Sequence, residues 1–261
     1  MLKIGIRAAH AAGDHIVKYM DRLEGITINN KGRNDFVSEV DHQAESIIIE
    51  TIKKSYPGHG FLAEERGKQG DSEYQWVIDP LDGTTNFLHG FPQFAVSIAL
   101  MYRGQPEQAI VYDPLRQELF TASKGAGAYM NNRRMRVSKR KSLQGALLGT
   151  GFPFGDNEHM ELFISTFKAL FPLVAGIRRA GAASLDLAYV ACGRLDGFWE
   201  IGLHIWDIAA GDLLIRESGG IITAIDGNPG HLESGTVLAG PLPIHKHMLD
   251  TMSHLDLKIT A

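Results

Sequence analysis

Cysteine is nearly missing from this sequence of 261 residues, which contains only Cys192. No disulfide can therefore form within the chain. Cys192 lies in the apolar stretch 188–193, where we expect a buried thiol without a redox or metal-binding role. Proteins without disulfides are typical of reducing compartments, so a cytoplasmic location is the simplest expectation.

Long apolar runs are missing as well. No stretch reaches the ~20 apolar residues that a membrane helix requires, and the amphipathic start of the chain lacks the apolar core and cleavage site of a secretory signal. The net charge of −4 argues against a protein built mainly to coat nucleic acid, although a local basic patch is compatible with it. We expect a globular protein that does not associate with membranes.

The order of predicted elements differs between the two halves of the chain. The first half has two helices, over 2–20 and from Ser38 to about Tyr56, and then strands near 60–63, 75–79, 94–102, 107–112 and 117–122. The second half alternates strands near 145–149, 195–201, 220–224 and 236–240 with helices near 158–170, 184–192, 206–218 and 243–256. This pattern predicts an α+β fold of layered helices and two sheets. We expect one domain over 1–261, whose halves, about 1–143 and 144–261, do not fold apart.

The most informative segment follows the apolar run that ends at Asp79. Pro80 fixes φ and removes a backbone donor where the chain turns, so the carboxylates of Asp79 and Asp82 and the carbonyl of Leu81 can point to one spot. These are hard oxygen ligands, which suit Mg²⁺ better than Zn²⁺. A D-x-x-D pattern alone is also common in capped turns, so the segment needs support from elsewhere in the chain.

Gly83 and Thr84 come directly after these acids, where glycine lets the backbone approach a ligand and successive amides favour an anion. Acids beside a phosphate site would repel the phosphate unless cations lay between them. Two further acidic spots could complete a metal site, Glu64-Glu65 after a short apolar strand and Asp207 in the first turn of an apolar helix. Each spot alone could equally be a solvated strand end or an ordinary helix start.

Several longer motifs resemble the inositol monophosphatase family over essentially the whole chain. They are Trp76–Phe87, Trp206–Leu214 running to Glu217–Gly220, Lys31-Gly32 with Asn34–Val37, Thr150–Phe154 and Leu185–Val190. The last three make the chain most similar to the bacterial SuhB type within that family.

The resemblance implies an αβαβα five-layered sandwich of the inositol monophosphatase and fructose-bisphosphatase type. It further implies a homodimer and lithium-sensitive hydrolysis of inositol monophosphate with two to three Mg²⁺ per subunit. By motif position, the metal ligands would be Glu64, Asp79, the Leu81 carbonyl, Asp82 and Asp207. Thr84 and Asp41 would help to activate water, and Glu65 would help to position it. The residues expected to contact substrate are Gly83, Thr84, Ala183, Glu200 and Asp207, with Glu200 accepting hydrogen bonds from ring hydroxyls.

Our mechanistic hypothesis is direct in-line attack by a metal-activated water, because phosphoryl transfer needs positioning and charge neutralisation more than covalent help. Related families use a similar site on adenosine bisphosphate, fructose bisphosphate or histidinol phosphate, and these substrates remain alternatives. Glu200 favours a small polyol over a nucleotide.

A second class of function is open because SuhB-type proteins act as partners of ribosomal RNA transcription complexes. The basic run Arg133–Lys141 could contact RNA or a transcription factor through its positive charge. It could also be no more than a solvated loop between strands.

Overall fold

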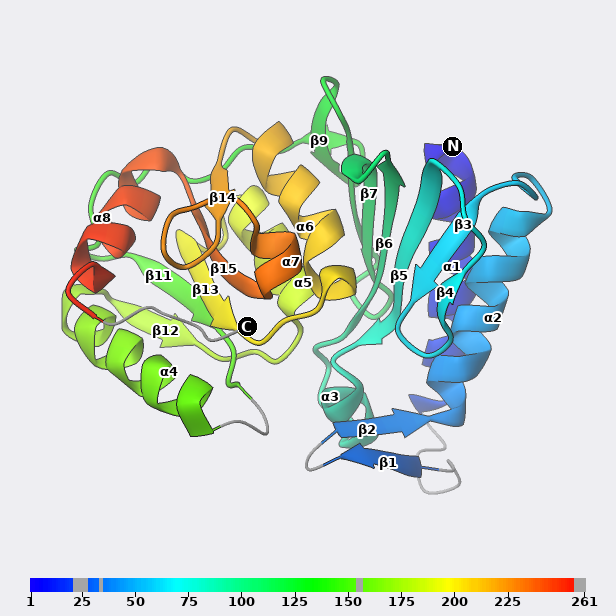
Figure 1. Cartoon of the computed structure of the whole chain (residues 1–261), viewed down its shortest axis with the longest axis horizontal. Coiled ribbons are helices and arrows are strands. Elements are labelled where there is room, and N and C mark those ends of the chain that lie inside the picture. The colour runs from blue at the N-terminus through cyan, green and yellow to red at the C-terminus, as the bar shows by residue number, and fades with distance from the viewer. Residues whose placement is uncertain (21–27, 33–34, 154–156, 256–261) are drawn as a thin grey trace.

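The fold is that of a computed structural model, which describes residues 1–20, 28–32, 35–153 and 157–255; the side chains of 28–32, 35–38 and 157–158 fall outside the description. Two motif positions named above, Asn34 and Phe154, lie outside the described residues. Helices and strands stack in five layers, helix, sheet, helix, sheet and helix (Figure 1). The predicted α+β sandwich is therefore confirmed. No helix among the described residues is long and apolar enough to cross a membrane.

The first layer is formed by α1 (Leu2–Val17) and α2 (Glu39–Lys53), which pack on one face of an eight-stranded sheet. The strand order in that sheet is β10-β9-β8-β7-β6-β5-β3-β4, antiparallel except for the parallel pair β3 and β5. Its strands are β3 (Gly60–Ala63), β4 (Gly67–Gln69), β5 (Tyr74–Asp82), β6 (Ala95–Tyr102), β7 (Gln105–Asp113), β8 (Glu118–Ser123), β9 (Gly127–Met130) and β10 (Arg133–Arg134). A separate hairpin joins β1 (Ile28–Gly32) to β2 (Asp35–Ser38).

The middle layer is formed by α5 (Ala183–Ala191) and α6 (Ile205–Glu217), which lie between the two sheets (Figure 1). The second sheet has the order β12-β11-β13-β15-β14, and α4 and α8 cover its outer face. The remaining elements are β11 (Leu147–Thr150), β12 (Gly176–Arg178), β13 (Gly197–Ile201), β14 (Ile221–Thr223), β15 (Thr236–Gly240), α3 (Thr84–Leu88), α4 (Asn157–Leu170), the 3₁₀ turn Phe171–Leu173, α7 (His231–Ser234) and α8 (Leu242–Met252).

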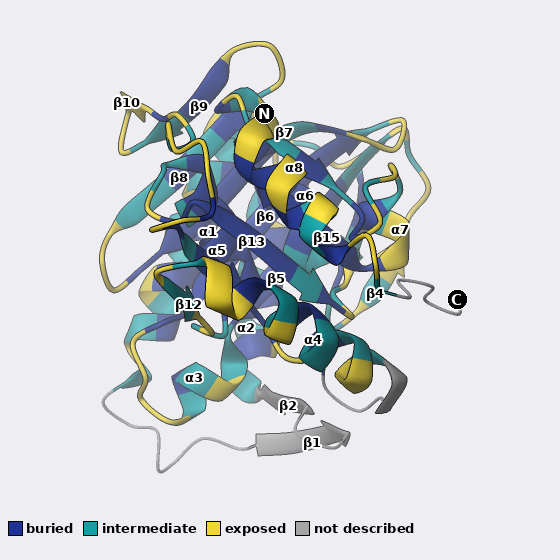
Figure 2. Ribbon diagram, turned by 90° about the vertical axis from the view of Figure 1, so that its left-hand side faces the viewer, coloured by how far each residue is buried: buried dark blue, intermediate teal, exposed yellow. Residues whose placement is uncertain are grey.

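Three clusters of buried apolar side chains fill the spaces between the five layers, and one of them lies on both sides of the middle helices. Because side chains alternate across a strand, Trp76 and Ile78 of β5 pack toward α1 and α2, whereas Val77 packs toward α5 and α6. In β13, Trp199 packs outward in the core that α4 and α8 cover, and Phe198 packs inward. The outer helices expose one side and the strands between them are buried (Figure 2). Both sheets are thus covered by helices on both faces.

Candidate active site

Strand β5 brings two of the predicted metal ligands to the edge of the middle layer. The regular pairing of β5 with β6 ends at Asp79 opposite Ser97 and resumes at Asp82 opposite Ala95. The two residues between them form the bulge that the Asp79-Pro80-Leu81-Asp82 turn requires. The Leu81 amide donates to Asp79 Oδ1 at 2.9 Å, which fixes the rotation of that carboxylate. Asp79 and Asp82 are 2% and 8% exposed, so both carboxylates are buried.

Glu64 reaches the same edge because β3 runs parallel to β5. Ala63 pairs with Ile78, and the Glu64 amide donates to the Ile78 carbonyl at 3.1 Å. Glu64 and Asp79 are therefore neighbours across the two strands, each one residue beyond the pair Ala63 and Ile78. The charge of Glu64 contributes to raising the pKa of Asp79. Glu65 lies against α2, the helix that also carries Asp41, and its carboxylate is 3.9 Å from His42 Nδ1.

Asp207 comes to the cluster from the start of α6, in the second half of the chain. Its Oδ2 accepts a hydrogen bond from the His204 amide at 2.7 Å, which caps the helix. The Ser97 hydroxyl donates to the Trp206 carbonyl at 3.2 Å. Since Ser97 pairs with Asp79 in the sheet, this bond fixes the start of α6 beside Asp79.

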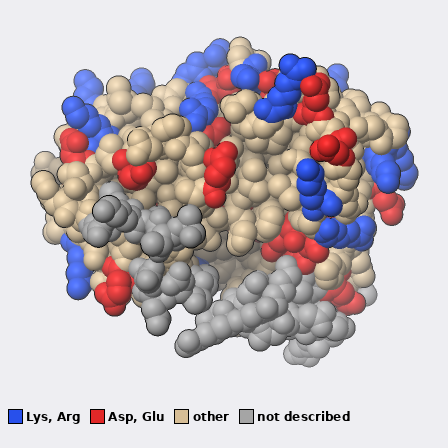
Figure 3. Space-filling model, viewed as in Figure 1, with Lys and Arg blue, Asp and Glu red and all other residues tan. Residues whose placement is uncertain are grey.

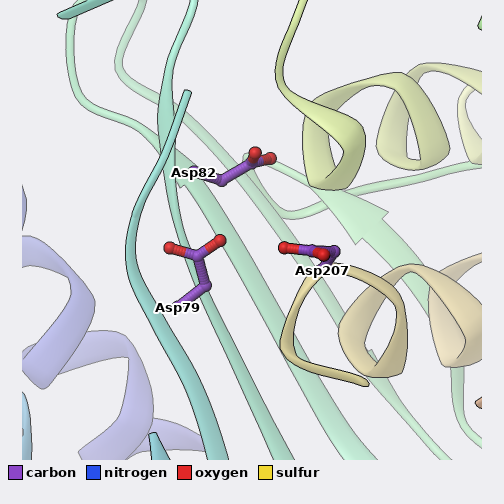
Figure 4. A group of neighbouring side chains, drawn as sticks. All are labelled: Asp79, Asp82 and Asp207. Carbon is purple, nitrogen blue, oxygen red and sulfur yellow. The ribbon is translucent and has the colours of Figure 1, made fainter. Parts of the chain in front are cut away.

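The three aspartates converge on one point, as Figure 4 shows. One ligand oxygen from each of Asp79, Asp82 and Asp207 lies within 4.8 Å of the others. Within the described part of the chain, this is the one group of three or more His, Cys, Asp or Glu side chains close enough to share a metal ion. The predicted ligands Asp79, Asp82 and Asp207 are thus brought together, with Glu64 beside Asp79.

The electrostatics of the cluster favour the binding of a cation. Burial, followed by the charges of Glu64, Asp82 and Asp207, raises the pKa of Asp79 well above its usual value. Burial also raises the pKa of Asp82, and burial with Asp82 raises the pKa of Asp207 to about 7. Buried carboxylates that repel one another are stable as ions only with a cation between them. An all-oxygen donor set of this kind fits Mg²⁺.

The start of α5 holds Asp82 in place. The Ser184 amide and hydroxyl donate to Asp82 Oδ2 at 2.7 and 2.5 Å. The Ala183 amide also hydrogen-bonds to Asp82 and lowers its pKa, which partly offsets the effect of burial. Ala183, predicted to line the substrate pocket, thus lies next to a predicted metal ligand.

Gly83 lies at the turn between the acidic cluster and α3. Its φ of 91° is in the left-handed region, and a Cβ there would come within 2.8 Å of the Gln93 carbonyl. Both the backbone conformation and the space therefore require glycine. Asn86, in α3, donates to the Gln93, Ala180 and Gly181 carbonyls, which joins the turn to the second half of the chain.

Thr84 and Asp41 meet, as the sequence predicted. The Thr84 hydroxyl lies 2.9 Å from Asp41 Oδ1 and 3.0 Å from the Leu81 carbonyl oxygen, and it can donate to either. Asp41 is fully buried in the first turn of α2. Both partners are acceptors, so the hydroxyl uses its hydrogen on one of them and its oxygen keeps lone pairs that can accept a hydrogen bond.

Glu200 lies on β13, on the far side of the cluster from α2. Burial raises its pKa well above the usual value, and the nearby charges of Asp186, Asp207 and Asp82 raise it further. Those three neighbours place Glu200 beside the acidic cluster but on the sheet that does not carry Asp79 or Asp82.

Several residues that shape the site are not evident in the sequence pattern. Ser97 acts through one hydrogen bond and Ser184 through two, each to a partner about a hundred residues away. Glu45, fully buried one turn after Asp41 in α2, accepts the Glu65 amide at 2.8 Å and so supports the turn that carries Glu64. Its spacing of four from Asp41 puts both acids on one face of the helix, a signal that the sequence does contain.

Known proteins similar to this chain point to one family. The profile of the inositol monophosphatase family matches residues 1–255. The chain is 53% identical over 258 residues to the protein named Nus factor SuhB of Pseudomonas aeruginosa, covering 97% of this chain and 95% of that protein.

Solved structures agree with this assignment. The extragenic suppressor protein SuhB of Bartonella henselae superposes with a TM-score of 0.93 at 41% identity, covering 98% of each chain. The inositol monophosphatase of Anabaena superposes with a TM-score of 0.84 at 39% identity, covering 97% of this chain and 95% of that one. This chain belongs to the inositol monophosphatase family.

Proposed function

We propose that this chain is a Mg²⁺-dependent phosphomonoesterase that hydrolyses inositol monophosphate to inositol and phosphate. The observation that carries the proposal is the meeting of Asp79, Asp82 and Asp207 within 4.8 Å, next to the Gly83-Thr84 turn. Membership of a phosphatase family and the likeness to an inositol monophosphatase structure support it. Buried carboxylates with strongly raised pKa values are typical of functional sites, which further supports the proposal.

Two to three Mg²⁺ would be held by Glu64, Asp79, the Leu81 carbonyl, Asp82 and Asp207. When bound, the ions would neutralise the charge of the phosphate and make a water more acidic. In each aspartate one oxygen is already occupied by a protein donor, namely the amides of Leu81, Ser184 and His204. These hydrogen bonds fix the rotation of the three carboxylates, so the ligands would be oriented before an ion binds.

Thr84 would take part in moving the proton of the attacking water. Its hydrogen is directed to Asp41 or to the Leu81 carbonyl, so its oxygen would accept a hydrogen bond from water and orient a water lone pair toward phosphorus. Glu65, on the adjacent turn, would help to position that water. The amides of Gly83 and Thr84 would bind the phosphate oxygens.

The leaving group would lie toward the second sheet. Glu200 would accept hydrogen bonds from its hydroxyls, while Ala183 and Asp207 would line the same pocket. An ionised carboxylate is purely an acceptor, which suits a polyol rich in hydroxyl donors. For this reason we favour inositol phosphate over nucleotide and sugar bisphosphates.

A substrate panel would test this proposal. Inositol 1-phosphate, adenosine 3′,5′-bisphosphate and fructose 1,6-bisphosphate would be assayed side by side, with and without Mg²⁺ and Li⁺. We expect hydrolysis only with Mg²⁺, the highest kcat/KM for inositol 1-phosphate, and inhibition by Li⁺. A preference for either bisphosphate would reject the substrate, and full activity in EDTA would reject the metal.

We also propose a homodimer in the cytoplasm, on the strength of the family resemblance. Size-exclusion chromatography with light scattering would measure the assembly directly. A mass of one subunit, 28.6 kDa, at micromolar concentration would contradict the dimer.

A second candidate function, as a partner of a transcription or antitermination complex, is favoured by the name Nus factor SuhB of the similar proteins. The basic run Arg133–Lys141 offers exposed charge for it: Arg133, Arg134, Arg136, Lys139, Arg140 and Lys141 are all exposed. Arg140 also pairs with Asp196 at 3.1 Å, so part of the run is structural. Basic side chains gather along the upper edge of the face in Figure 3, the end at which Figure 1 shows β9.

Salt-dependent binding would separate this role from hydrolysis. Binding of ribosomal leader RNA and of purified transcription factors would be measured at low and moderate salt, in the wild type and in Asp82→Asn. Charge contacts predict affinity that falls steeply with salt and survives in Asp82→Asn. Absence of binding to both classes of partner at low salt would discard this candidate.

A further inference from the structure

Two glycines alternate along β11 and into the residue after it, Gly149 and Gly151. Neither has a φ in the left-handed region, so backbone conformation is not the reason for glycine there. At both positions the space that a Cβ would need is filled. A Cβ on Gly149 would come within 2.8 Å of Leu195 and 3.1 Å of Phe198. These glycines therefore leave room for side chains of the neighbouring elements.

At Gly151 the space belongs to Glu200. A Cβ built there would overlap the Cδ and both carboxylate oxygens of Glu200. The register explains the approach: β11 runs parallel to β13 with Thr150 opposite Trp199, so Gly151 comes opposite Glu200. The Glu200 carboxylate lies directly against the bare backbone of Gly151.

The backbone at Gly151 has little freedom to retreat. Thr150 is 1% exposed, and Pro153 is buried. Between them, the Phe152 ring packs edge-on against Phe163 at 5.3 Å, and the Arg179 guanidinium lies 4.8 Å from its centroid. A side chain at 151 would consequently displace the Glu200 carboxylate and leave the strand end where it is.

The displaced carboxylate would have poor alternatives. The charges of Asp186, Asp207 and Asp82 act against its ionised form, and Arg179, which lies over the Phe152 ring, offsets them in part. Movement toward the acidic cluster would bring the Glu200 carboxylate nearer to Asp82 and Asp207. Movement away from the cluster would break its proposed hydrogen bonds to the substrate hydroxyls. The position of the carboxylate therefore depends on the missing Cβ at 151.

We propose that Gly151 is a specificity-determining residue, whose bare backbone sets where Glu200 meets the hydroxyl groups of a polyol phosphate. This rests on the proposed phosphatase function, since it concerns the leaving-group side of the same site. Gly151 touches Glu200 and not the reacting atoms, so it is a positioning residue. A substitution at Gly151 should change the preference between phosphate esters. Substitutions in the acidic cluster of Asp79, Asp82 and Asp207 should instead abolish hydrolysis of every ester.

The test compares Gly151→Ala with Gly58→Ala, a matched control whose Cβ would meet nothing within 4 Å. Each is assayed with Mg²⁺ on inositol 1-phosphate and on p-nitrophenyl phosphate, which has no hydroxyl on its leaving group. In Gly151→Ala we expect the ratio of the two kcat/KM values to fall by about 10- to 100-fold, through KM for the inositol ester. Activity on p-nitrophenyl phosphate should stay within about threefold, and Gly58→Ala should match the wild type.

A compensating change makes the test specific to Glu200. Asp is one methylene shorter than Glu, so the double variant Gly151→Ala with Glu200→Asp has room for the new methyl group. It should regain at least part of the lost selectivity relative to Gly151→Ala, and Glu200→Asp alone serves as its reference. An unchanged ratio in Gly151→Ala, or a loss that the second substitution leaves untouched, would overturn the proposal.

Two outcomes concern folding and the underlying activity. If Gly151→Ala fails to fold, Gly151→Ala with Glu200→Ala should fold, because the overlapping carboxylate is gone; failure of that variant too would overturn the proposal. If the wild type hydrolyses neither ester with Mg²⁺, it is the proposed phosphatase function that fails. A wild type active on both esters with an unchanged ratio in Gly151→Ala rejects only the role of Gly151.

Discussion

The first half of the chain brings most of its acids to the site from two neighbouring strands, whereas the second half brings them from a helix start and from a strand of the other sheet. Glu64 directly follows β3, and Asp79 lies in β5 where the regular pairing with β6 is interrupted. Asp207 caps α6, and Glu200 lies on β13. The first half thus holds most of the proposed metal ligands and the second half most of the proposed leaving-group contacts. Chemistry and substrate choice should therefore respond to different substitutions.

The largest effect is expected at Asp82, in the first half. Asp82→Asn removes an anionic metal ligand, and we expect kcat for inositol 1-phosphate to fall by roughly three orders of magnitude or more. Circular dichroism should show a folded chain, because the amide oxygen can still accept from Ser184. Asp71→Asn, at a side chain that is 98% exposed, is the matched control. Near-normal turnover in Asp82→Asn would contradict the assignment of the site.

A smaller loss is expected at Thr84. Thr84→Val keeps the shape and removes the hydroxyl that contacts Asp41, so we expect kcat to fall by about 100-fold with KM little changed. Thr85→Val, at the exposed neighbouring residue, controls for the loss of a hydroxyl in α3. Equal kinetics in the two variants would remove Thr84 from the proton transfer.

In the second half, Glu200→Gln should act on binding and not on turnover. Loss of the charge weakens hydrogen bonds from substrate hydroxyls, and we expect KM for inositol 1-phosphate to rise about tenfold. Glu233→Gln, at an exposed position of the same half, should behave as the wild type. An equal fall in kcat/KM for p-nitrophenyl phosphate and for inositol 1-phosphate would contradict the proposed division of roles between the two halves.

The smallest expected effect is on the stability of the folded chain, through the pKa of Asp207 and the Mg²⁺ that we propose it binds together with ligands of the first half. In the absence of metal, the pKa of Asp207 is about 7 in the folded chain, against an ordinary value of 3.8. Between those values the folded chain holds a proton that the unfolded chain has released. The free energy of unfolding therefore falls as pH rises through this window, and the contribution is lost above about pH 7.

Mg²⁺ should reverse that loss, because it binds the ionised carboxylates. At 100 times its Kd, the ion adds about 2.7 kcal/mol to the free energy of unfolding, which is a rise in Tm of roughly 5–10 °C for a chain of this size. Differential scanning calorimetry should find a larger rise at pH 8 than at pH 6. Asp207→Asn should reduce this pH dependence without abolishing it, because burial also raises the pKa values of Asp79 and Glu200. An equal rise at both pH values in the wild type would disprove the linkage.

Much of the fold followed from local pattern. The helices predicted over 158–170, 184–192 and 206–218 are observed over Asn157–Leu170, Ala183–Ala191 and Ile205–Glu217, because apolar periodicity and capping act within a few residues. The first helix ends earlier than predicted, at Val17 and not at residue 20. Short elements such as α3 and β10, of five and two residues, were not predicted because they carry too few residues for a period.

Predicting the candidate site was harder where it depends on distant contacts. Asp79 and Asp82 lie in one turn and could be paired from spacing alone. Asp207 joins them through the packing of α6 on the first sheet, where Ser97 bonds to the start of the helix across a separation of 109 residues. The overlap of Gly151 with Glu200 depends on the register of two parallel strands, which no local pattern reveals.

The bond between Asp82 and Ser184 spans 102 residues, which matters while the chain is being made. At roughly 5–20 residues per second, a ribosome needs about 5–20 s to synthesise that interval. As they emerge, the strands around Val77, Val111 and Phe120 lack α5 and α6, which cover them in the finished protein. The nascent eight-stranded sheet therefore presents an open apolar face, and we expect it to depend on chaperones that shield such surfaces until the second half emerges.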